Sequence, residues 1–345
     1  MRTVVLTLVA VAGLALAAGV SVVAIGLYNV SAQAGHWPGV SWMLHTIFRN
    51  SVRLRAPSME DAPDLSDPDL VALGAWHYAT ACLSCHAAPG TQRSSTIRAM
   101  VPEPRHIRDA IEGWRPNHLH WIVENGAKMT GMPGWPAEGR GDEVWAVVAY
   151  LEAIRSEADD DAPDPTTLAP VRADEPVAYC TSCHGAVAGP VPQLSLLDAD
   201  YIETQLRAYA DGRRPSGIMQ HAASLIDESS FEELADHFAE MTPRRSQEPP
   251  ESADGAEALA TRGTDDVPAC TACHGPGAQE RPERAPAIAG QNAAYIAAQL
   301  MLWRDGVRTG SPRMQAAARD LSDTQIMQLA DWFAARTPDQ QGEQE

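Results

Sequence analysis

The sequence predicts an all-α protein in which an N-terminal membrane-spanning helix precedes three helical domains. Three observations carry this prediction: a long uncharged segment opens the chain, a C-x-x-C-H motif occurs three times, and the second half repeats one helical pattern. Acidic, Pro-containing stretches between the motif regions are typical of linkers. The predicted division is 1–30 for the anchor, 31–68 for a membrane-proximal linker, 69–155, 173–243 and 255–340 for the domains, and 156–172 and 244–254 for the linkers between them.

The N-terminal segment runs from Val4 to Tyr28 without a charged residue. At about 1.5 Å per residue, it is long enough to cross the roughly 30 Å hydrocarbon core of a bilayer. A cleaved signal peptide is the alternative, because Val30–Ala32 has the composition of a weak cleavage site. The apolar region of a signal peptide is only about 7 to 15 residues long, so we expect an uncleaved, single-pass anchor.

The six cysteines of the chain all belong to the three C-x-x-C-H motifs. Thiols at i and i+3 on a helical turn face the same side, so both can bond to one porphyrin edge while the adjacent histidine reaches the iron. A zinc site needs four ligands and each motif supplies three, and a thioredoxin-like dithiol needs a βαβ surround that is missing here. The motifs predict three covalently bound c-type haems, attached at Cys82 and Cys85, Cys180 and Cys183, and Cys270 and Cys273, with His86, His184 and His274 on the irons.

The cysteine chemistry and the net charge together limit location and partners. Haem attachment of this kind takes place outside the cytoplasmic membrane, so the haem domains are expected in the periplasm, tethered to that membrane by the anchor. The formal net charge of −19 argues against nucleic acid as a partner, because phosphates would repel the chain. It suits solubility or docking on a basic protein face.

The second and third domains form an internal repeat. Tyr201–Arg214 aligns with Tyr295–Arg308, and Tyr, Ile, Gln, Leu, Asp, Gly and Arg coincide. In both copies 24 positions separate one methionine, Met219 or Met314, from the proline that follows the last helix. Apolar residues at helical spacing predict an amphipathic closing helix in each copy.

The methionines of the predicted loops are candidates for the second axial ligand of each iron. A His/Met pair raises the reduction potential relative to two histidines and blocks small molecules from the iron. Met314 is the candidate in the third domain, and Met219 is preferred over His221 in the second. In the first domain Met132 is preferred because a rigidifying proline follows it, and Met129 is expected to be a packing residue. The histidines expected at the surface are His77, His106, His118 and His120.

Residues from about 173 to 340 resemble the diheme cytochromes of the c-four type, through segments such as "GAEALATRGTDDVPACTACHG" and "PAIAGQNAAYIAAQL". The first domain is similar to membrane-anchored monohaem class I cytochromes c, through "GAWHYATACLSCHAAPG" and "GAKMTGMPGW". The resemblance implies three class I cytochrome c domains, each with a proline that braces the proximal histidine. It also implies distal ligands at Met132, Met219 and Met314. The candidate prolines are Pro192, Pro286 and, in the first domain, Pro102 or Pro104.

The second domain departs from the repeat at its start. It has Thr166–Pro176, "TTLAPVRADEP", where the third domain has the helix-forming segment "GAEALATRG". Its N-terminal helix is therefore expected to be short or missing, with packing that depends on a neighbouring domain.

These features predict a membrane-tethered periplasmic triheme cytochrome c that is an electron-transfer protein and not itself an enzyme. Its redox partners are expected to be a quinol-oxidising complex or dehydrogenase as donor and a terminal oxidase as acceptor. One alternative is a fixed electron-transfer subunit of a membrane dehydrogenase or oxidase complex. The other is a haem enzyme such as a peroxidase, which needs an open iron site that a methionine in each domain would close.

Overall fold

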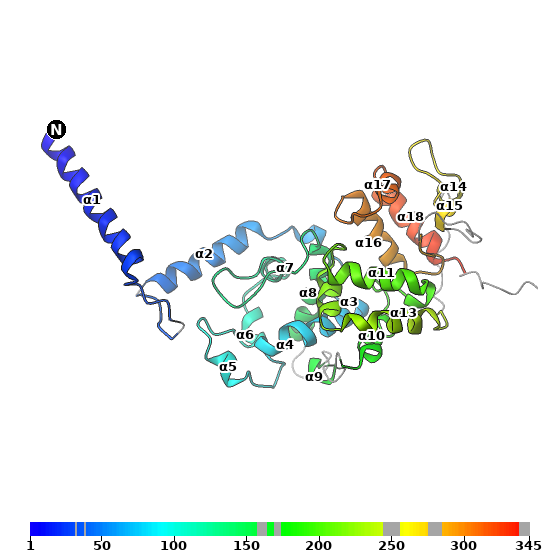
Figure 1. Cartoon of the computed structure of the whole chain (residues 1–345), viewed down its shortest axis with the longest axis horizontal. Helices are drawn as coiled ribbons and strands as arrows, with labels where there is room; N and C mark the ends of the chain where they lie inside the picture. Colours follow the sequence, from blue (N-terminus) through cyan, green and yellow to red (C-terminus); the bar gives the residue numbers. More distant parts are fainter. Residues whose placement is uncertain are drawn as a thin grey trace, which may run out of the picture. The chain divides into compact units, whose positions relative to one another are not determined.

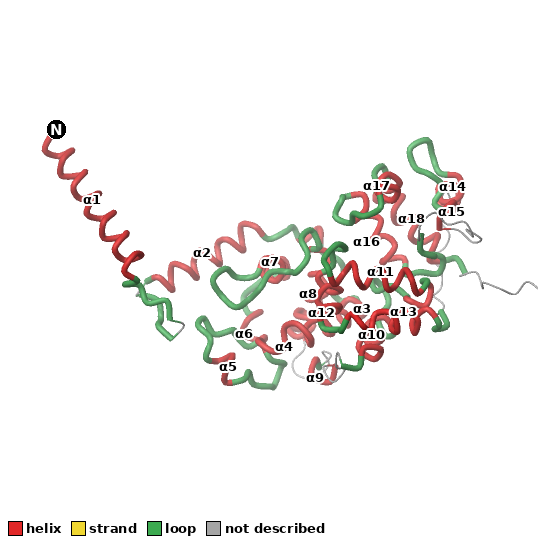
Figure 2. Tube along the Cα trace, in the orientation of Figure 1, coloured by secondary structure: helices red, strands yellow, loops and turns green. Residues whose placement is uncertain are grey.

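The computed structural model of the chain describes residues 1–31, 33–37, 39–156, 164–168, 174–243, 256–274 and 285–337. These residues form helices joined by loops and contain no strand, in agreement with the predicted all-α class (Figures 1 and 2). They divide into two compact units, Met1–Ser51 with Ser94–Pro104, and Val52–Arg93 with the described residues from Arg105 onward. Of the two linkers predicted between the domains, most of 156–172 and all of 244–254 lie outside the described residues.

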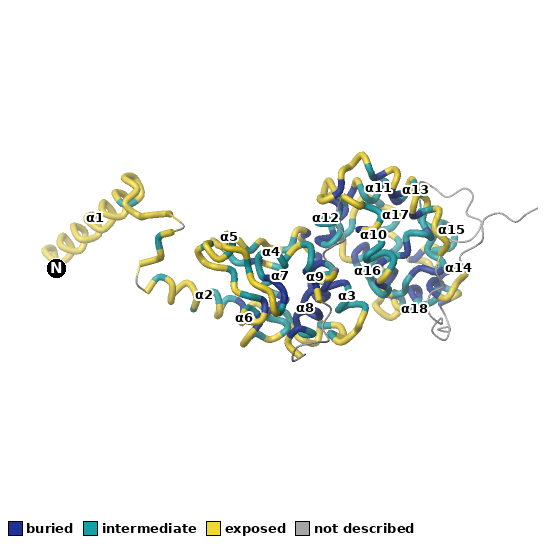
Figure 3. The backbone as a smooth tube through the Cα atoms, turned by 90° about the horizontal axis from the view of Figure 1, so that it is seen from below, coloured by how far each residue is buried: buried dark blue, intermediate teal, exposed yellow. Residues whose placement is uncertain are grey.

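The first unit contains the apolar N-terminal helix α1 (Arg2–Ile25), none of whose residues is buried (Figure 3). Gly26 ends α1 in the left-handed conformation that favours glycine, with φ of 71°. Within the described part of the chain, α1 is the one helix long and apolar enough to cross a membrane, and a signal sequence near an N-terminus has the same properties. The unit also holds α5 (Ser95–Arg98) and most of α2 (Val40–Arg55).

The second unit contains three helical groups, each with a hydrophobic core of its own. The first group holds η1 (Met59–Asp61), α3 (Pro68–His77), η2 (Tyr78–Cys82), α4 (Leu83–His86), α6 (Ile107–Ile111), α7 (Pro116–Asn125) and α8 (Gly141–Ser156). The second group holds α10 (Pro176–His184), η3 (Leu194–Leu196), α11 (Ala199–Ala210), α12 (Gly217–Ser224), η4 (Glu228–Ser230) and α13 (Phe231–Ala239). The third group holds α14 (Ala256–Arg262), α15 (Thr271–His274), α16 (Ala293–Arg304), α17 (Pro312–Ala318) and α18 (Asp323–Ala334).

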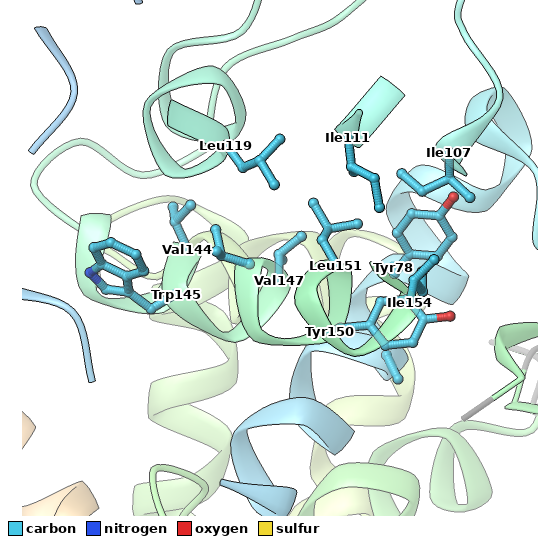
Figure 4. Close-up of a cluster of buried hydrophobic side chains, with 12 residues drawn as sticks. Tyr78, Ile107, Ile111, Leu119, Val144, Trp145, Val147, Tyr150, Leu151 and Ile154 are labelled. Carbon is cyan, nitrogen blue, oxygen red and sulfur yellow. The ribbon is translucent and has the colours of Figure 1, made fainter. Parts of the chain in front are cut away.

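The core of the first group surrounds α8, which is buried without interruption from Val144 to Leu151. Side chains of α8 such as Leu151 point toward Ile111 of α6 and Leu119 of α7 (Figure 4). On another side α3 crosses α8 at Gly74, where an added Cβ would lie 1.9 Å from the carbonyl oxygen of Ala146. Because that atom is backbone, the two helices approach this closely only with glycine at the crossing.

The second and third groups repeat one arrangement. In the second group α11 packs against α13, and in the third α16 packs against α18. In the third group α14 also packs against α18, whereas the short helix α9 (Pro165–Leu168), which precedes the second group, contacts α3 and η2 of the first group. The segment that precedes the second group therefore packs against the first group, as the departure from the repeat predicted. The predicted closing helices are confirmed by the buried residues Phe231, Leu234, Ala235 and Phe238 in α13 and Ile326, Leu329, Ala330 and Phe333 in α18.

A smaller apolar cluster joins the first and second groups. Leu73 of α3 and Ala146 of α8 are buried together with Val187 and Val191 from the loop after α10. Ile218 of α12 packs against this cluster. The first two groups therefore share a buried apolar contact.

Candidate cofactor sites

In each C-x-x-C-H motif the second cysteine and the histidine lie in a helical turn, and the first cysteine lies in that turn or directly before it. Cys180, Cys183 and His184 lie within α10, Cys82 ends η2 and is followed by α4, and Cys270 directly precedes α15. Cysteines three positions apart on such a turn face the same side, as attachment to one porphyrin edge requires. None of the six cysteines is in a disulfide.

Three thiols of the first two motifs, Cys82, Cys180 and Cys183, are buried in a way that disfavours the thiolate form. Burial raises the pKa of Cys82 and Cys180 to about 12 and that of Cys183 to about 11. Redox-active and nucleophilic cysteines instead have a pKa below the ordinary value of about 8.5. Among the described residues, no group of three His, Cys, Asp or Glu side chains is placed to hold a metal ion. The raised pKa values of these three thiols agree with the exclusion of a redox-active dithiol site.

The three motif histidines are oriented in the same way, by a hydrogen bond from Nδ1 to a backbone carbonyl. Because a carbonyl only accepts, the proton is on Nδ1, and Nε2 carries the lone pair that binds a metal. Burial also lowers the pKa of His86 and His184, which favours the neutral imidazole that an iron ligand must be. The pairs are His86 with Arg105 at 2.9 Å, His184 with Pro192 at 3.0 Å, and His274 with Pro286 at 2.8 Å.

The bracing prolines are confirmed as hydrogen-bond acceptors in the second and third groups only. Pro192 and Pro286 supply the carbonyls there, as expected. In the first group the acceptor is Arg105, so the prediction of Pro102 or Pro104 was wrong for this contact. The acceptor is a backbone carbonyl, which every residue type has. This hydrogen bond therefore requires a residue at the right position in the loop but does not require that residue to be proline.

The candidate methionines of the second and third groups occupy matching positions. Met219 lies in the first turn of α12 and Met314 in the first turn of α17, so the expected loops are short helices. The N–H of each methionine bonds to the hydroxyl of a serine three residues earlier, Ser216 at 3.1 Å and Ser311 at 3.3 Å. Met314 packs against the third core together with Cys270.

The two methionines of the first group differ in exposure. Met132 is half-buried, and its N–H bonds to the hydroxyl of Thr130 at 3.1 Å. Met129 has a positive φ of 63°, and its side chain is 87% exposed. The side chain of Met129 therefore packs against no core of the described residues, and its packing against a haem edge stays a prediction. Met132 stays the preferred candidate, and it is not part of the described first core.

The second group brings its motif and its methionine to one cavity. Cys180, Cys183, His184 and Met219 all line it. Paired thiols, an oriented imidazole and a thioether among apolar walls fit the edge, the two axial positions and the flat apolar face of a haem. The apolar walls of the cavity are formed by residues that include Leu194, Leu197, Ile202, Leu206, Leu234 and Phe238.

Two histidines expected at the surface are buried. His77 is 7% exposed and His120 is 4% exposed. The ring centroid of His77 lies 5.5 Å from that of His221 and 4.8 Å from that of Trp135. No sequence pattern indicated this burial, because histidine counts as polar in a hydropathy pattern and the covering residues come from distant segments.

Burial of His77 predicts acid sensitivity. Burial, with a smaller contribution from His221 of α12, lowers the pKa of His77 from 6.5 to about 3. Between these values the unfolded chain binds a proton that the folded chain does not, so stability is lost as the pH falls from about 6.5 toward 3. We expect His77→Gln to flatten the fall of the thermal midpoint over this range. His237→Gln, at an exposed position, is the control, and equal slopes for both variants and the parent protein would contradict the prediction.

The second and third groups are held together by contacts that mirror each other. Arg214 donates to the hydroxyl of Tyr295 at 3.0 Å, and Arg308 donates to the hydroxyl of Tyr201 at 3.2 Å. The two arginines, and likewise the two tyrosines, occupy matching positions of the internal repeat. Burial alone would lower the pKa of Arg214, but the tyrosines around it, Tyr209 first among them, raise it above its ordinary value. The guanidinium therefore remains charged at this interface.

Comparison with known proteins identifies the family. Residues 69–151 and 257–333 match the family described as cytochrome c oxidase, cbb3-type, subunit III. A cytochrome c4 of Azotobacter vinelandii is 29% identical over 175 residues, which cover 45% of this chain and 83% of that protein. Thiosulfate dehydrogenase electron acceptors of Stutzerimonas stutzeri and Thiomonas intermedia are 35% and 39% identical over 171 residues, covering 45% and 46% of this chain and 77% and 79% of those proteins. This chain belongs to the cytochrome c4-like family of c-type cytochromes.

Membership in this family defines the cofactor and the general function of the protein. A c-type cytochrome carries covalently bound haem, in agreement with the C-x-x-C-H motifs. The first and third motifs of this c-type cytochrome fall inside the two matched ranges, and the second motif lies between them. Its function is electron transfer, as in the cytochromes c4 and the electron acceptors to which it is similar.

Proposed function

We propose that this c-type cytochrome is a membrane-tethered carrier of single electrons in the periplasm, with three haems on three class I cytochrome c domains. The observation that carries the proposal is the threefold recurrence of a helical C-x-x-C-H motif whose histidine donates from Nδ1 to a backbone carbonyl. The proposed axial pairs are His86 with Met132, His184 with Met219, and His274 with Met314. The proposed attachment points are Cys82, Cys85, Cys180, Cys183, Cys270 and Cys273.

In each proposed site the two thiols, the histidine and the methionine have different roles in holding one haem. Each haem, when bound, supplies an iron that takes up and releases one electron. The two thiols would hold the haem covalently, and the hydrogen bond at Nδ1 keeps the histidine ring in one orientation. The methionine would be the second protein ligand of the iron and would keep water and other small ligands from it.

Close packing of the three helical groups supports transfer between haems within one chain. The second group shares an apolar cluster with the first and the arginine–tyrosine contacts with the third. These contacts bring neighbouring groups together, and that packing supports electron transfer from one group to the next.

The donor and acceptor are proposed from chemistry and from similarity. Two relatives are named electron acceptors of thiosulfate dehydrogenase, which supports a dehydrogenase as the donor. A quinol-oxidising complex is the other donor class, and a terminal oxidase is the proposed acceptor. The length and composition of α1 support a single-pass anchor in the cytoplasmic membrane.

The haem content and the closure of the irons test the proposal directly. The full chain, produced in a host that attaches c-type haem and extracted in detergent, is expected to give three haems per chain by pyridine haemochrome. A reductive titration should take up three electrons per chain. The reduced protein is expected not to bind carbon monoxide rapidly, because a methionine closes each iron. Fewer than three haems, or rapid binding with loss of the sulfur-to-iron absorption band, would overturn the proposal.

The partners are tested by following the haems in mixtures. The oxidised protein is mixed with a thiosulfate dehydrogenase and thiosulfate, or with a quinol-oxidising complex and quinol. Reduction at a rate that falls with ionic strength, followed by reoxidation by a terminal oxidase, is the expected result. Co-purification of a catalytic subunit after mild detergent extraction would instead favour a fixed subunit of a larger complex.

A further inference from the structure

A buried carboxylate of the first group meets the N-terminus of the helix that carries Met219. Glu143, in the first turn of α8, has a side chain only 10% exposed. Its carboxylate accepts from the N–H groups of Gly217 at 2.6 Å and Ile218 at 3.3 Å, and from the hydroxyl of Ser216 at 2.5 Å. The first N–H groups of a helix have no partner within the helix, and a negative charge there is stabilising. Glu143 therefore caps α12 from another group.

Ser216 connects this carboxylate to the candidate ligand. Its hydroxyl donates to Glu143 and accepts from the N–H of Met219 at 3.1 Å. The carboxylate thus fixes the direction of the hydroxyl, and the hydroxyl holds the backbone of the methionine. A change at Glu143 reaches Met219 through one intervening side chain.

The charge of Glu143 is balanced within the same contact. A terminal guanidinium nitrogen of Arg140 lies 2.7 Å from the carboxylate, and the other donates to the carbonyl of Pro215 at 2.6 Å. The indole N–H of Trp135 donates to the carboxylate at 3.2 Å. Arg140, Trp135 and Glu143 all belong to the first group, and they contact one another as well as the start of the second group's helix α12.

The internal repeat provides a comparison within the chain. Ser311 caps Met314 as Ser216 caps Met219, but among the described residues no carboxylate bonds to Ser311. The helix of the third group continues with Pro312 and Arg313, both exposed. In the described part of the chain, a carboxylate therefore caps the methionine helix of the second group but not that of the third.

The first residues of α12 are of types that allow the first group to pack closely against them. A Cβ on Gly217 would lie 2.1 Å from the indole nitrogen of Trp135, so only glycine admits that ring. Ile218 packs against the apolar cluster that includes Leu73 of α3. Glycine and isoleucine thus replace the proline and arginine of the other copy where the first group docks.

We propose that Glu143 is a positioning residue for Met219: docking of the first group holds the thioether at the second haem site. This inference rests on the proposed function, in which Met219 is the sixth ligand of that haem. Docking of the first group and ligation of the second iron are then one coupled property of the chain.

The test compares Glu143→Ala with Asp142→Ala in the full-length haem-loaded protein. Asp142 bonds to Arg140 and is 46% exposed, and its carboxylate makes no contact with α12 in the described part of the chain. With Glu143→Ala, the sulfur-to-iron band of the oxidised protein should fall by about one third, the share of one haem in three. Added imidazole should bind at one haem with affinity increased on the order of tenfold, because a cap of the methionine helix is lost. Asp142→Ala should behave like the parent protein.

Further variants separate a positioning role from a structural one. Glu143→Gln keeps an acceptor oxygen toward α12, so it should recover part of the band, and it carries the test if Glu143→Ala loses haem. A full band and unchanged imidazole affinity in both variants, with only a lower unfolding temperature, would overturn the proposal.

Met219→Leu distinguishes failure of this inference from failure of the proposed function. It should remove the same share of the band, and Glu143→Ala added to it should cause no further spectral change. A full band in Met219→Leu would show that Met219 is not a ligand, whatever the result at Glu143. A further loss in the double variant would contradict the positioning role, since Glu143 would then act on another haem.

Discussion

A chain carrying Cys180→Ala with Cys183→Ala is expected to mature with two haems instead of three and to lose the fold of its second group. These thiols are the proposed covalent attachment in the cavity that His184 and Met219 also line. Without a covalently held haem, the apolar walls of that cavity lose most of their contacts. Pyridine haemochrome per chain measures the first effect, and limited proteolysis between the first and third groups measures the second.

Ser182→Ala provides the matched control for this change. Ser182 lies between the two cysteines, and its hydroxyl donates to the carbonyl of Tyr179 at 2.6 Å. It should keep all three haems and resist proteolysis like the parent protein. Three haems in the cysteine variant would show that attachment does not need these thiols and would remove the basis of the second site.

Gly74→Ala is expected to lower the stability of the first group strongly. The new Cβ would lie 1.9 Å from the carbonyl oxygen of Ala146, and the backbone of α8 cannot move without displacing the whole core around it. We expect a loss of about 3 kcal/mol or more, which corresponds to a fall in the thermal midpoint on the order of 10 °C. Thermal unfolding followed by circular dichroism measures it.

Gly19→Ala tests whether the effect comes from the helix crossing or from glycine chemistry in general. Gly19 is also helical, and an added Cβ there has no atom within 4 Å. This variant should unfold at the temperature of the parent protein. An unchanged midpoint for Gly74→Ala as well would mean that α3 and α8 do not cross as closely as described.

The local parts of the fold were predictable from the sequence because they depend on short-range patterns. Helical spacing identified the closing helices, and the motif spacing identified the thiols and histidines that lie on helical turns. The orientation of His184 and His274 followed from the resemblance, which implied Pro192 and Pro286 as braces. The distal roles of the methionines, the haem count and the domain boundaries stay predictions.

The polar contacts between groups were not predictable, because no periodicity connects the residues that they join. His77 and Glu143 appear in the sequence as ordinary polar positions on helices, but in the structure both are buried beside residues of the second group. A trace of this docking is nevertheless present in the repeat. Gly217 and Ile218 differ from the proline and arginine of the other copy at the point where the first group covers the chain.

The mirrored arginine–tyrosine contacts have a consequence for how the two copies have diverged. A surface that binds its own duplicate must remain self-complementary, as in isologous dimers. Tyr201 and Arg214 therefore constrain, and are constrained by, Tyr295 and Arg308. A substitution in one copy leaves its counterpart in the other facing an altered partner. The tyrosine and the arginine that the two copies share at these positions are the residues that such mutual restraint would keep.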